Sequence, residues 1–158
     1  MIDDIRCTVM DFERVARVIG DPLIWPSISD DDHTVFDPAA VKNILDDTRL
    51  YVLMPNENTV LTFIPQSTIL YDSHIAIRLG HRGKEGFAGT RQALGWIFDH
   101  TPCLKIVGRF PVTKRELLWM ARAMKFHLEG FCRKSILRNG QLEDQIMIGL
   151  TKEDWLKA

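Results

Sequence analysis

The chain has 158 residues, of which 46% are hydrophobic and 26% charged, which is enough apolar material for one compact core. We therefore expect a single domain over residues 1–158. The formal net charge of -1 and a pI near 6.5 exclude the strongly basic surface that nucleic-acid binding requires.

The cysteines and the apolar runs exclude further classes of protein. Cys7, Cys103 and Cys132 show no CxxC spacing, so neither a disulfide framework nor a zinc site is indicated. No apolar run approaches the roughly 18 residues of a membrane span, and the N-terminus lacks the basic and apolar pattern of a secretion signal. We expect a cytoplasmic protein without membrane contact and without a metal.

The first third of the chain predicts mostly helix. Ile5 to Met10 is a strand candidate, and Asp11 is a candidate N-cap for a helix from Phe12 to Gly20. Residues 21–32 predict a loop or irregular helix, and Asp37-Pro38 opens a short helix that reaches Asp46.

A run of strands follows. Leu50 to Met54 and Thr59 to Ile64 are rich in β-branched and aromatic residues, and the turn sequence between them predicts a hairpin. Thr68 to Leu79 alternates between an apolar and a mixed face, which predicts a further strand ending at Gly80.

The second half alternates between helices and strands. We first predict a glycine-rich segment from Arg82 to Gly89, followed by a helix that stops by Pro102. A strand from Leu104 to Phe110 and a helix capped by Thr113 come next. The chain then forms strands from Phe131 to Leu137 and from Leu142 to Leu150, joined at Asn139-Gly140, and a helical tail with Trp155. This order predicts an α+β fold with a mixed sheet.

The segment from Arg82 to Gly89 is the most informative for function. Its three glycines, between a strand end and a helix start, let backbone N–H groups turn toward an anion, and Arg82 and Lys84 add positive charge. A Walker motif is absent because no Gly-Lys pair is followed by Ser or Thr, and a dinucleotide fingerprint would follow the first strand. From the residues alone, a pyrophosphate site and an ordinary glycine-rich turn both stay open.

Two blocks of residues resemble the GNAT superfamily of N-acetyltransferases. Gly86-Phe87-Ala88 resembles the Gly-x-Ala part of the family's Arg/Gln-x-x-Gly-x-Gly/Ala loop, with Gly83 at the Arg/Gln position and Arg82 one place earlier. Residues 126–130, Phe-His-Leu-Glu-Gly, resemble a second block of ribosomal-protein and other N-terminal acetyltransferases, together with Arg133, Asn139-Gly140, Asp144 and Trp155. A looser resemblance is to GNAT-like proteins of tailed phages.

This resemblance implies a fold and a co-substrate. The fold is a mixed central sheet of about six to seven strands, flanked by helices and splayed between the fourth strand, Thr68 to Leu79, and the fifth, Leu104 to Phe110. The co-substrate is acetyl-CoA, and the residues that the resemblance places against it are Ile77, Arg78, Arg82, Gly83, Lys84, Gly86, Phe87, Ala88, Gly89 and Lys114.

Acetyl transfer to an amine needs a base, a polarised carbonyl and a proton for the thiolate. His74 is the candidate catalytic base, with Asp72 on the same strand face, although His74 as an ordinary structural histidine stays an open alternative. The resemblance implies a backbone N–H near Ile77 for the carbonyl. The tyrosine that many members carry in the second crossover helix as general acid is absent, because the chain has only Tyr51 and Tyr71.

The sequence therefore predicts an acetyl-CoA-dependent N-acetyltransferase. Its acceptor is an amine-bearing small molecule, a protein N-terminus or a lysine, no nucleic acid is expected, and a homodimer is compatible with the sequence. Two alternatives stay open: a GNAT-fold protein with weak or lost catalysis that binds CoA or serves a structural role, for example in a phage, and a protein that binds nucleotide or phosphate without acyl chemistry.

Overall fold

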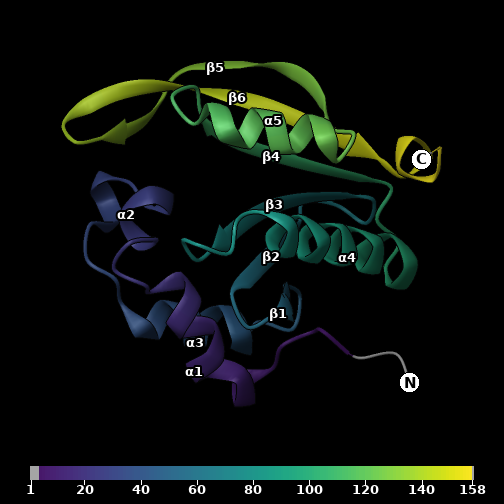
Figure 1. The fold of residues 1–158 in the computed structure, drawn as a ribbon, viewed down its shortest axis with the longest axis horizontal. Helices are drawn as coiled ribbons and strands as arrows, with labels where there is room; N and C mark the ends of the chain where they lie inside the picture. The colour runs from purple at the N-terminus through teal and green to yellow at the C-terminus, as the bar shows by residue number, and fades with distance from the viewer. Residues whose placement is uncertain (1–3, 158) are drawn as a thin grey trace.

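Residues 4–157 are described by the computed structural model, and they form a mixed β-sheet with helices packed on its faces (Figure 1). The strands are β1 (Tyr51–Asn56), β2 (Thr59–Pro65), β3 (Leu70–Ile77), β4 (Lys105–Pro111), β5 (His127–Arg138) and β6 (Gln141–Thr151). The helices are α1 (Phe12–Ile19), α2 (Trp25–Ile28), α3 (Pro38–Asp46), α4 (Lys84–His100), α5 (Arg115–Ala123) and α6 (Lys152–Leu156), with two 3-10 turns, η1 (Val9–Asp11) and η2 (Asp31–His33). The predicted α+β class is confirmed.

The strand predicted over Ile5 to Met10 is wrong. The chain there makes an isolated bridge between Arg6 and Leu53 and then turns into η1. The turn is a capping box, in which the side chains of Thr8 and Asp11 each accept a backbone N–H from the other end of the turn. This local cap ends the extended segment before it can pair along β1.

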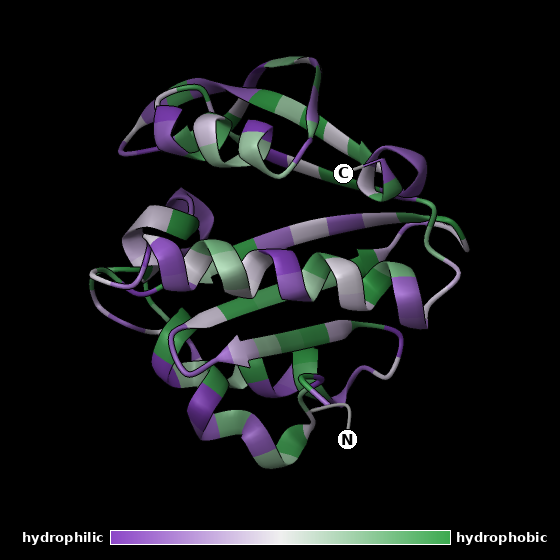
Figure 2. Cartoon of the chain, turned by 45° about the vertical axis from the view of Figure 1, so that its right-hand side comes forward, coloured by the Kyte–Doolittle hydropathy of each residue, from purple (hydrophilic) through white to green (hydrophobic). Residues whose placement is uncertain are grey.

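The first three strands are covered on both faces. Neighbouring residues of a strand point to opposite faces, so Leu53 faces α4 whereas Val52 faces α1 and α3. The buried cluster on the α4 face includes Leu53, Leu61, Phe63, Tyr71, Ala93, Leu94, Ile97, Phe98, Ile106 and Leu150. The cluster on the other face contains Val15, Val18, Ile24, Val41, Leu45, Val52, Met54, Val60 and Ala76. The hydrophobic stretches along the strands are visible in Figure 2.

The last three strands carry a smaller core. Phe110 lies on the same face of β4 as Ile106, so α5 covers the same face of the sheet as α4. The buried cluster under α5 is Phe110, Ala121, Ile146 and Ile148. On the opposite face Arg109 is exposed and Met147 is half-buried. The two ends of the sheet therefore differ in how completely they are covered.

The sheet splays between β3 and β4, as predicted. These strands are parallel, and their register pairs are Leu70 with Lys105, Tyr71 with Ile106 and Asp72 with Val107. Beyond that point the Ser73 hydroxyl donates to the Val107 carbonyl at 2.8 Å, and the strands then diverge. The other neighbouring strands are antiparallel. Within residues 4–157, no helix is long and apolar enough to cross a membrane.

Candidate functional site

The candidate site lies where β3 and β4 separate. We call the divergence of β3 residues 73–77 from β4 residues 108–111 the notch. The Arg78 N–H donates to the carbonyl of Asn58, the residue before β2, and Ile77 pairs with Thr59 of β2. By the alternation of an antiparallel ladder, the backbone groups of Ile75 and Ile77 therefore point toward β4. The notch is therefore lined on one side by strand amides that are free of a β2 partner.

The N-terminus of α4 lies beside the notch. The helix begins at Lys84, Gly83 is its N-cap without a side-chain cap, and the first helical N–H to find a carbonyl is that of Phe87, which donates to Gly83 at 3.0 Å. The predicted loop up to Gly89 is therefore mostly helix. The amides of residues 83–86 are the ones that an anion can reach, and the helix dipole adds to their positive potential.

The three glycines of this segment have different roles. A Cβ at Gly86 would lie 2.7 Å from the His81 carbonyl oxygen, and one at Gly89 would lie 2.7 Å from the Asn56 side chain. These two glycines let α4 pack tightly against the sheet. A Cβ at Gly83 would meet nothing within 4 Å, so the backbone of Gly83 is open to a ligand. This open, uncapped backbone fits a phosphate group.

Two basic residues, Arg82 and Lys84, lie at the start of α4. Arg82 and Lys84 are exposed, and Arg82 Nε donates to the Ile77 carbonyl at 3.2 Å, which holds that guanidinium near the notch. Lys114 is the N-cap of α5, whose first turn lies on the same face as α4 (Figure 1). Arg78 is engaged elsewhere, in an ion pair with Asp21 at 3.0 Å.

One acidic side chain lies in the first turn of α4. Glu85 contacts His81 Nδ1 at 2.8 Å and accepts from the Asn58 amide at 3.1 Å. The contact with His81, followed by the bond from Asn58, lowers the pKa of Glu85. This carboxylate is therefore charged at neutral pH, next to the amides that would hold an anion.

The opposite face of the notch carries titratable groups. His74 is exposed, and its Nε2 atom lies 3.5 Å from Asp72 Oδ2. Burial raises the pKa of Asp72, but the nearby His74, the Ser73 N–H and the charge of Arg109 outweigh it, so the pKa lies below its ordinary value. Asp72, His74 and Ala76 share one strand face, and Ala76 packs in the cluster under α1 and α3. The candidate base is thus on the face away from α4.

A second acidic group lies on this face. Glu129 forms an ion pair with Lys105 at 2.8 Å, and a Cβ at Gly149 would collide with the Glu129 carboxylate. Gly149 pairs with Val107, the residue at which β3 and β4 part. The glycine therefore leaves room for a charged pair beside the notch.

No protein-family model matches the sequence, and no curated protein matches it significantly. Solved structures do match: a Vibrio cholerae spermidine N-acetyltransferase in complex with CoA and spermine has a TM-score of 0.78 at 16% identity, covering 96% of this chain and 95% of that chain. A chimera of that enzyme, SpeG, with hSSAT gives 0.79 at 13% identity, covering 97% and 96%.

The chain has the GNAT fold. A third structure, smu.2055 from Streptococcus mutans UA159, agrees with a TM-score of 0.74 at 15% identity over 92% of this chain and 96% of that chain. At these identities the likeness shows the fold. The finer resemblance to ribosomal-protein acetyltransferases or phage members stays a prediction.

Within this GNAT fold the predicted site residues separate into groups. Gly83, Lys84, Gly86 and Arg82 gather at the start of α4, and His74 lies on the other face of the notch. Phe87 is half-buried against the α4 cluster and Ala88 is exposed on the second turn. Their roles in binding stay predictions.

Sequence reasoning missed Ser73. Its hydroxyl links β3 to β4 at the last point before the strands diverge. Nothing in the local sequence marks it, because its importance depends on a strand that lies more than thirty residues further along the chain. Arg109 lies two residues after Val107 on β4, and its charge acts on Asp72, so it lies near the point where β3 and β4 diverge.

Proposed function

We propose that this protein is an acetyl-CoA-dependent N-acetyltransferase that transfers an acetyl group directly to an amine. The observation that carries the proposal is the notch. On one face of the sheet it is flanked by a helix N-terminus whose free amides can bind an anion, and on the other face by His74, the candidate base. Support comes from the GNAT fold and from a neighbour of that fold that was solved with CoA and spermine.

The residues at the start of α4 would hold the pyrophosphate of acetyl-CoA. The amides of residues 83–86 would donate hydrogen bonds, and Arg82, Lys84 and Lys114 would add positive charge. The open space at Gly83 lets the phosphates approach the backbone. The thioester end would enter the notch.

The catalytic groups act on the acceptor amine. When bound, acetyl-CoA supplies the acetyl group: its C–S bond breaks as the C–N bond to the amine forms, and CoA leaves as a thiolate. His74 takes the proton that the amine nitrogen loses, and the charged Asp72 orients the imidazole and stabilises its protonated form. The amides of Ile75 and Ile77 donate to the carbonyl oxygen as it gains negative charge.

The leaving group needs little help from the protein. A thiol has a pKa near about 8.5, so a thiolate leaves readily and solvent can protonate it. This accounts for an α5 helix without tyrosine, whose sequence is Arg-Glu-Leu-Leu-Trp-Met-Ala-Arg-Ala. The absence of that tyrosine from α5 is thus compatible with catalysis.

Two measurements on purified protein test the proposal. Isothermal titration should show binding of acetyl-CoA and CoA, and thiol release with a panel of amines should show turnover. His74→Ala should lower kcat by about 10²- to 10⁴-fold, the usual contribution of a general base, and leave CoA affinity unchanged.

His127→Ala is the matched control, because His127 is similarly exposed and lies 3.3 Å from an aspartate, Asp154. This variant should turn over like the wild type. A folded wild-type protein that fails to bind acetyl-CoA at millimolar concentration would contradict the function. Unchanged turnover in His74→Ala would reject His74 as the base.

A further inference from the structure

The tip of the β5–β6 hairpin is attached to the N-terminal half of the chain. The Asp31 carboxylate accepts the Asn139 N–H through Oδ1 and the Gly140 N–H through Oδ2, each at 2.8 Å. The partners are 108 and 109 residues apart in sequence. Both carboxylate oxygens are used, and we call this pair of bonds the Asp31 clasp.

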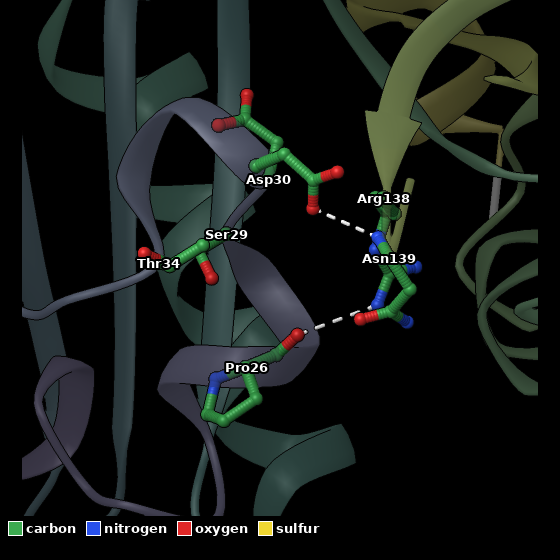
Figure 3. Close-up of a pocket in the computed structure, with 7 residues that line it drawn as sticks. Pro26, Ser29, Asp30, Thr34, Arg138 and Asn139 are labelled. Carbon is green, nitrogen blue, oxygen red and sulfur yellow. Dashed lines mark hydrogen bonds between the residues drawn. The ribbon is translucent and has the colours of Figure 1, made fainter. Parts of the chain in front are cut away.

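The hairpin turn is built to present these two amides. Asn139 and Gly140 have φ values of 52° and 73°, the left-handed conformation of a tight two-residue hairpin turn. Arg138 reinforces the contact by donating to the Pro26 carbonyl at 3.4 Å (Figure 3). A small pocket of about 180 Å³ remains between the two segments, with Ser29, Asp30 and Thr34 on one side.

The clasp joins the two halves of the sheet at the end opposite to their strand contact. The segment around α2 belongs to the first half, because Ile24 packs with Ala76 of β3. The hairpin belongs to the second half, because β6 pairs along β4 and then extends beyond Pro111, which pairs with Gln145. In Figure 1 the hairpin tip and α2 lie at the same end of the molecule, past the ends of β3 and β4.

The candidate base therefore lies between two connections. On one side, β3 and β4 pair up to Asp72 and Val107. On the other side, the halves meet again at the Asp31 clasp. His74 and Arg109 follow the first connection on their strands and share the face on which α2 packs. On this face the notch is bounded at both ends.

We propose that the Asp31 clasp closes the far end of the acceptor side of the notch and so limits the size of the amine that can reach His74. The proposal rests on the proposed acetyltransferase function and adds a determinant of acceptor selectivity. On this proposal, a short amine reaches His74 without moving the hairpin tip. A longer or branched amine must displace the hairpin tip and break two hydrogen bonds to a carboxylate, which are stronger than neutral ones.

Substitutions at Asp31 weaken the clasp to different extents. Asp31→Ala removes both acceptors, and Asp31→Asn keeps one carbonyl oxygen and so at most part of the contact. Asp32→Ala is the matched control, since Asp32 is an exposed neighbour and its backbone bond to Asp30 survives the substitution. None of these residues touches the groups that we assign to catalysis or to CoA binding.

The experiment combines amide exchange with acceptor selectivity. The Asn139 and Gly140 amides should exchange at least about tenfold faster in Asp31→Ala, the factor that corresponds to about 1.4 kcal/mol. The ratio of kcat/KM for a bulky branched amine to that for a short linear amine should rise about tenfold, with an intermediate rise in Asp31→Asn and none in Asp32→Ala. The Kd of CoA should not change.

Each outcome decides a different point. Faster exchange with an unchanged selectivity ratio would show a structural contact only and overturn the proposal. Unchanged exchange in Asp31→Ala would overturn it as well, because the clasp would not hold the tip. A wild-type protein that binds CoA but shows the same ratio as Asp31→Ala contradicts the clasp alone. A wild-type protein that binds neither acetyl-CoA nor CoA contradicts the proposed function and the clasp with it.

Discussion

The half of the sheet formed by β1, β2 and β3 and the half formed by β4, β6 and β5 are packed differently. The first half is covered on both faces, with Phe63 and Val60 buried in opposite clusters. In the second half, α5 lies over a small buried cluster, and Arg109 is exposed on the opposite face. A half with a core on both faces, which holds the α4 N-terminus and His74, thus meets a more lightly packed half that forms the opposite wall of the notch.

The largest expected effect compares a core phenylalanine in each half. Phe63→Ala should cost about 3–5 kcal/mol of unfolding free energy, because its fully buried site cannot collapse around the cavity. Phe110→Ala should cost less, since the small cluster around it can relax. Urea unfolding of both variants gives these values. Equal losses would show that the halves do not differ in packing.

Gly86 and Gly83, at the start of α4, contrast a tightly packed position with an open one. Gly86→Ala should destabilise the protein by about 1–3 kcal/mol, because the added Cβ meets both the His81 carbonyl of the preceding loop and the Ile77 side chain of β3. It should also weaken CoA binding at least about tenfold. Gly83→Ala should stay within about 0.5 kcal/mol of the wild type, because its Cβ enters open space. Thermal unfolding and CoA titration check both, and a neutral Gly86→Ala would refute the packing argument.

The pH dependence of stability tests Asp72, which lies where the two halves of the sheet meet. Although burial raises the pKa of Asp72, His74, the Ser73 N–H and Arg109 lower it further, so the net shift is downward. The stabilisation from charged Asp72 is present above the unfolded pKa of about 3.9 and lost as the pH falls through the lower folded value. Between about pH 6 and about pH 3, Asp72→Asn should therefore lose less stability than the wild type.

Urea unfolding at both pH values measures this difference. Asp32→Asn serves as the control, because Asp32 is exposed, and it should behave like the wild type. An Asp72→Asn protein with the acid sensitivity of the wild type would show that Asp72 gains nothing from its neighbours in both halves.

The smallest expected effect concerns the charge at the start of α4. Glu85→Gln should tighten CoA binding about twofold to fivefold, because it removes a negative charge beside the amides of residues 83–86. Low ionic strength should enlarge the difference, since screening weakens interactions between exposed charges. Weaker CoA binding by Glu85→Gln would show that Glu85 positions the helix start through His81 and Asn58 instead.

Local patterns predicted the elements well where one feature dominated. The hairpin of β1 and β2 and the turn at Asn139-Gly140 follow from turn residues between β-branched runs. The strand β5 is longer than predicted, because its first residues, His127 to Glu129, are all exposed and no buried side chain marks one face of the strand. The start of α4 was misplaced, because glycines that pack inside a helix look like loop glycines in the sequence.

Features that depend on contacts between distant parts of the chain could not be predicted from local sequence patterns. The splay was expected from a family resemblance, whereas its exact position depends on the register of Asp72 with Val107 and on the Ser73 hydroxyl. The three consecutive aspartates at residues 30–32 lie in the segment predicted as loop or irregular helix, and nothing in that pattern indicates that Asp31 binds the hairpin tip. Contacts across more than a hundred residues leave no periodic trace in the sequence.

The notch opens on two opposite faces of the sheet, and this has a kinetic consequence. A co-substrate that enters from the α4 face and an amine that enters from the face of His74 do not obstruct each other. Under the proposed function both would be bound together, and each product would leave on its own side. Initial-rate plots should then show intersecting lines, the pattern of a ternary complex, rather than the parallel lines of an enzyme that carries the acetyl group itself.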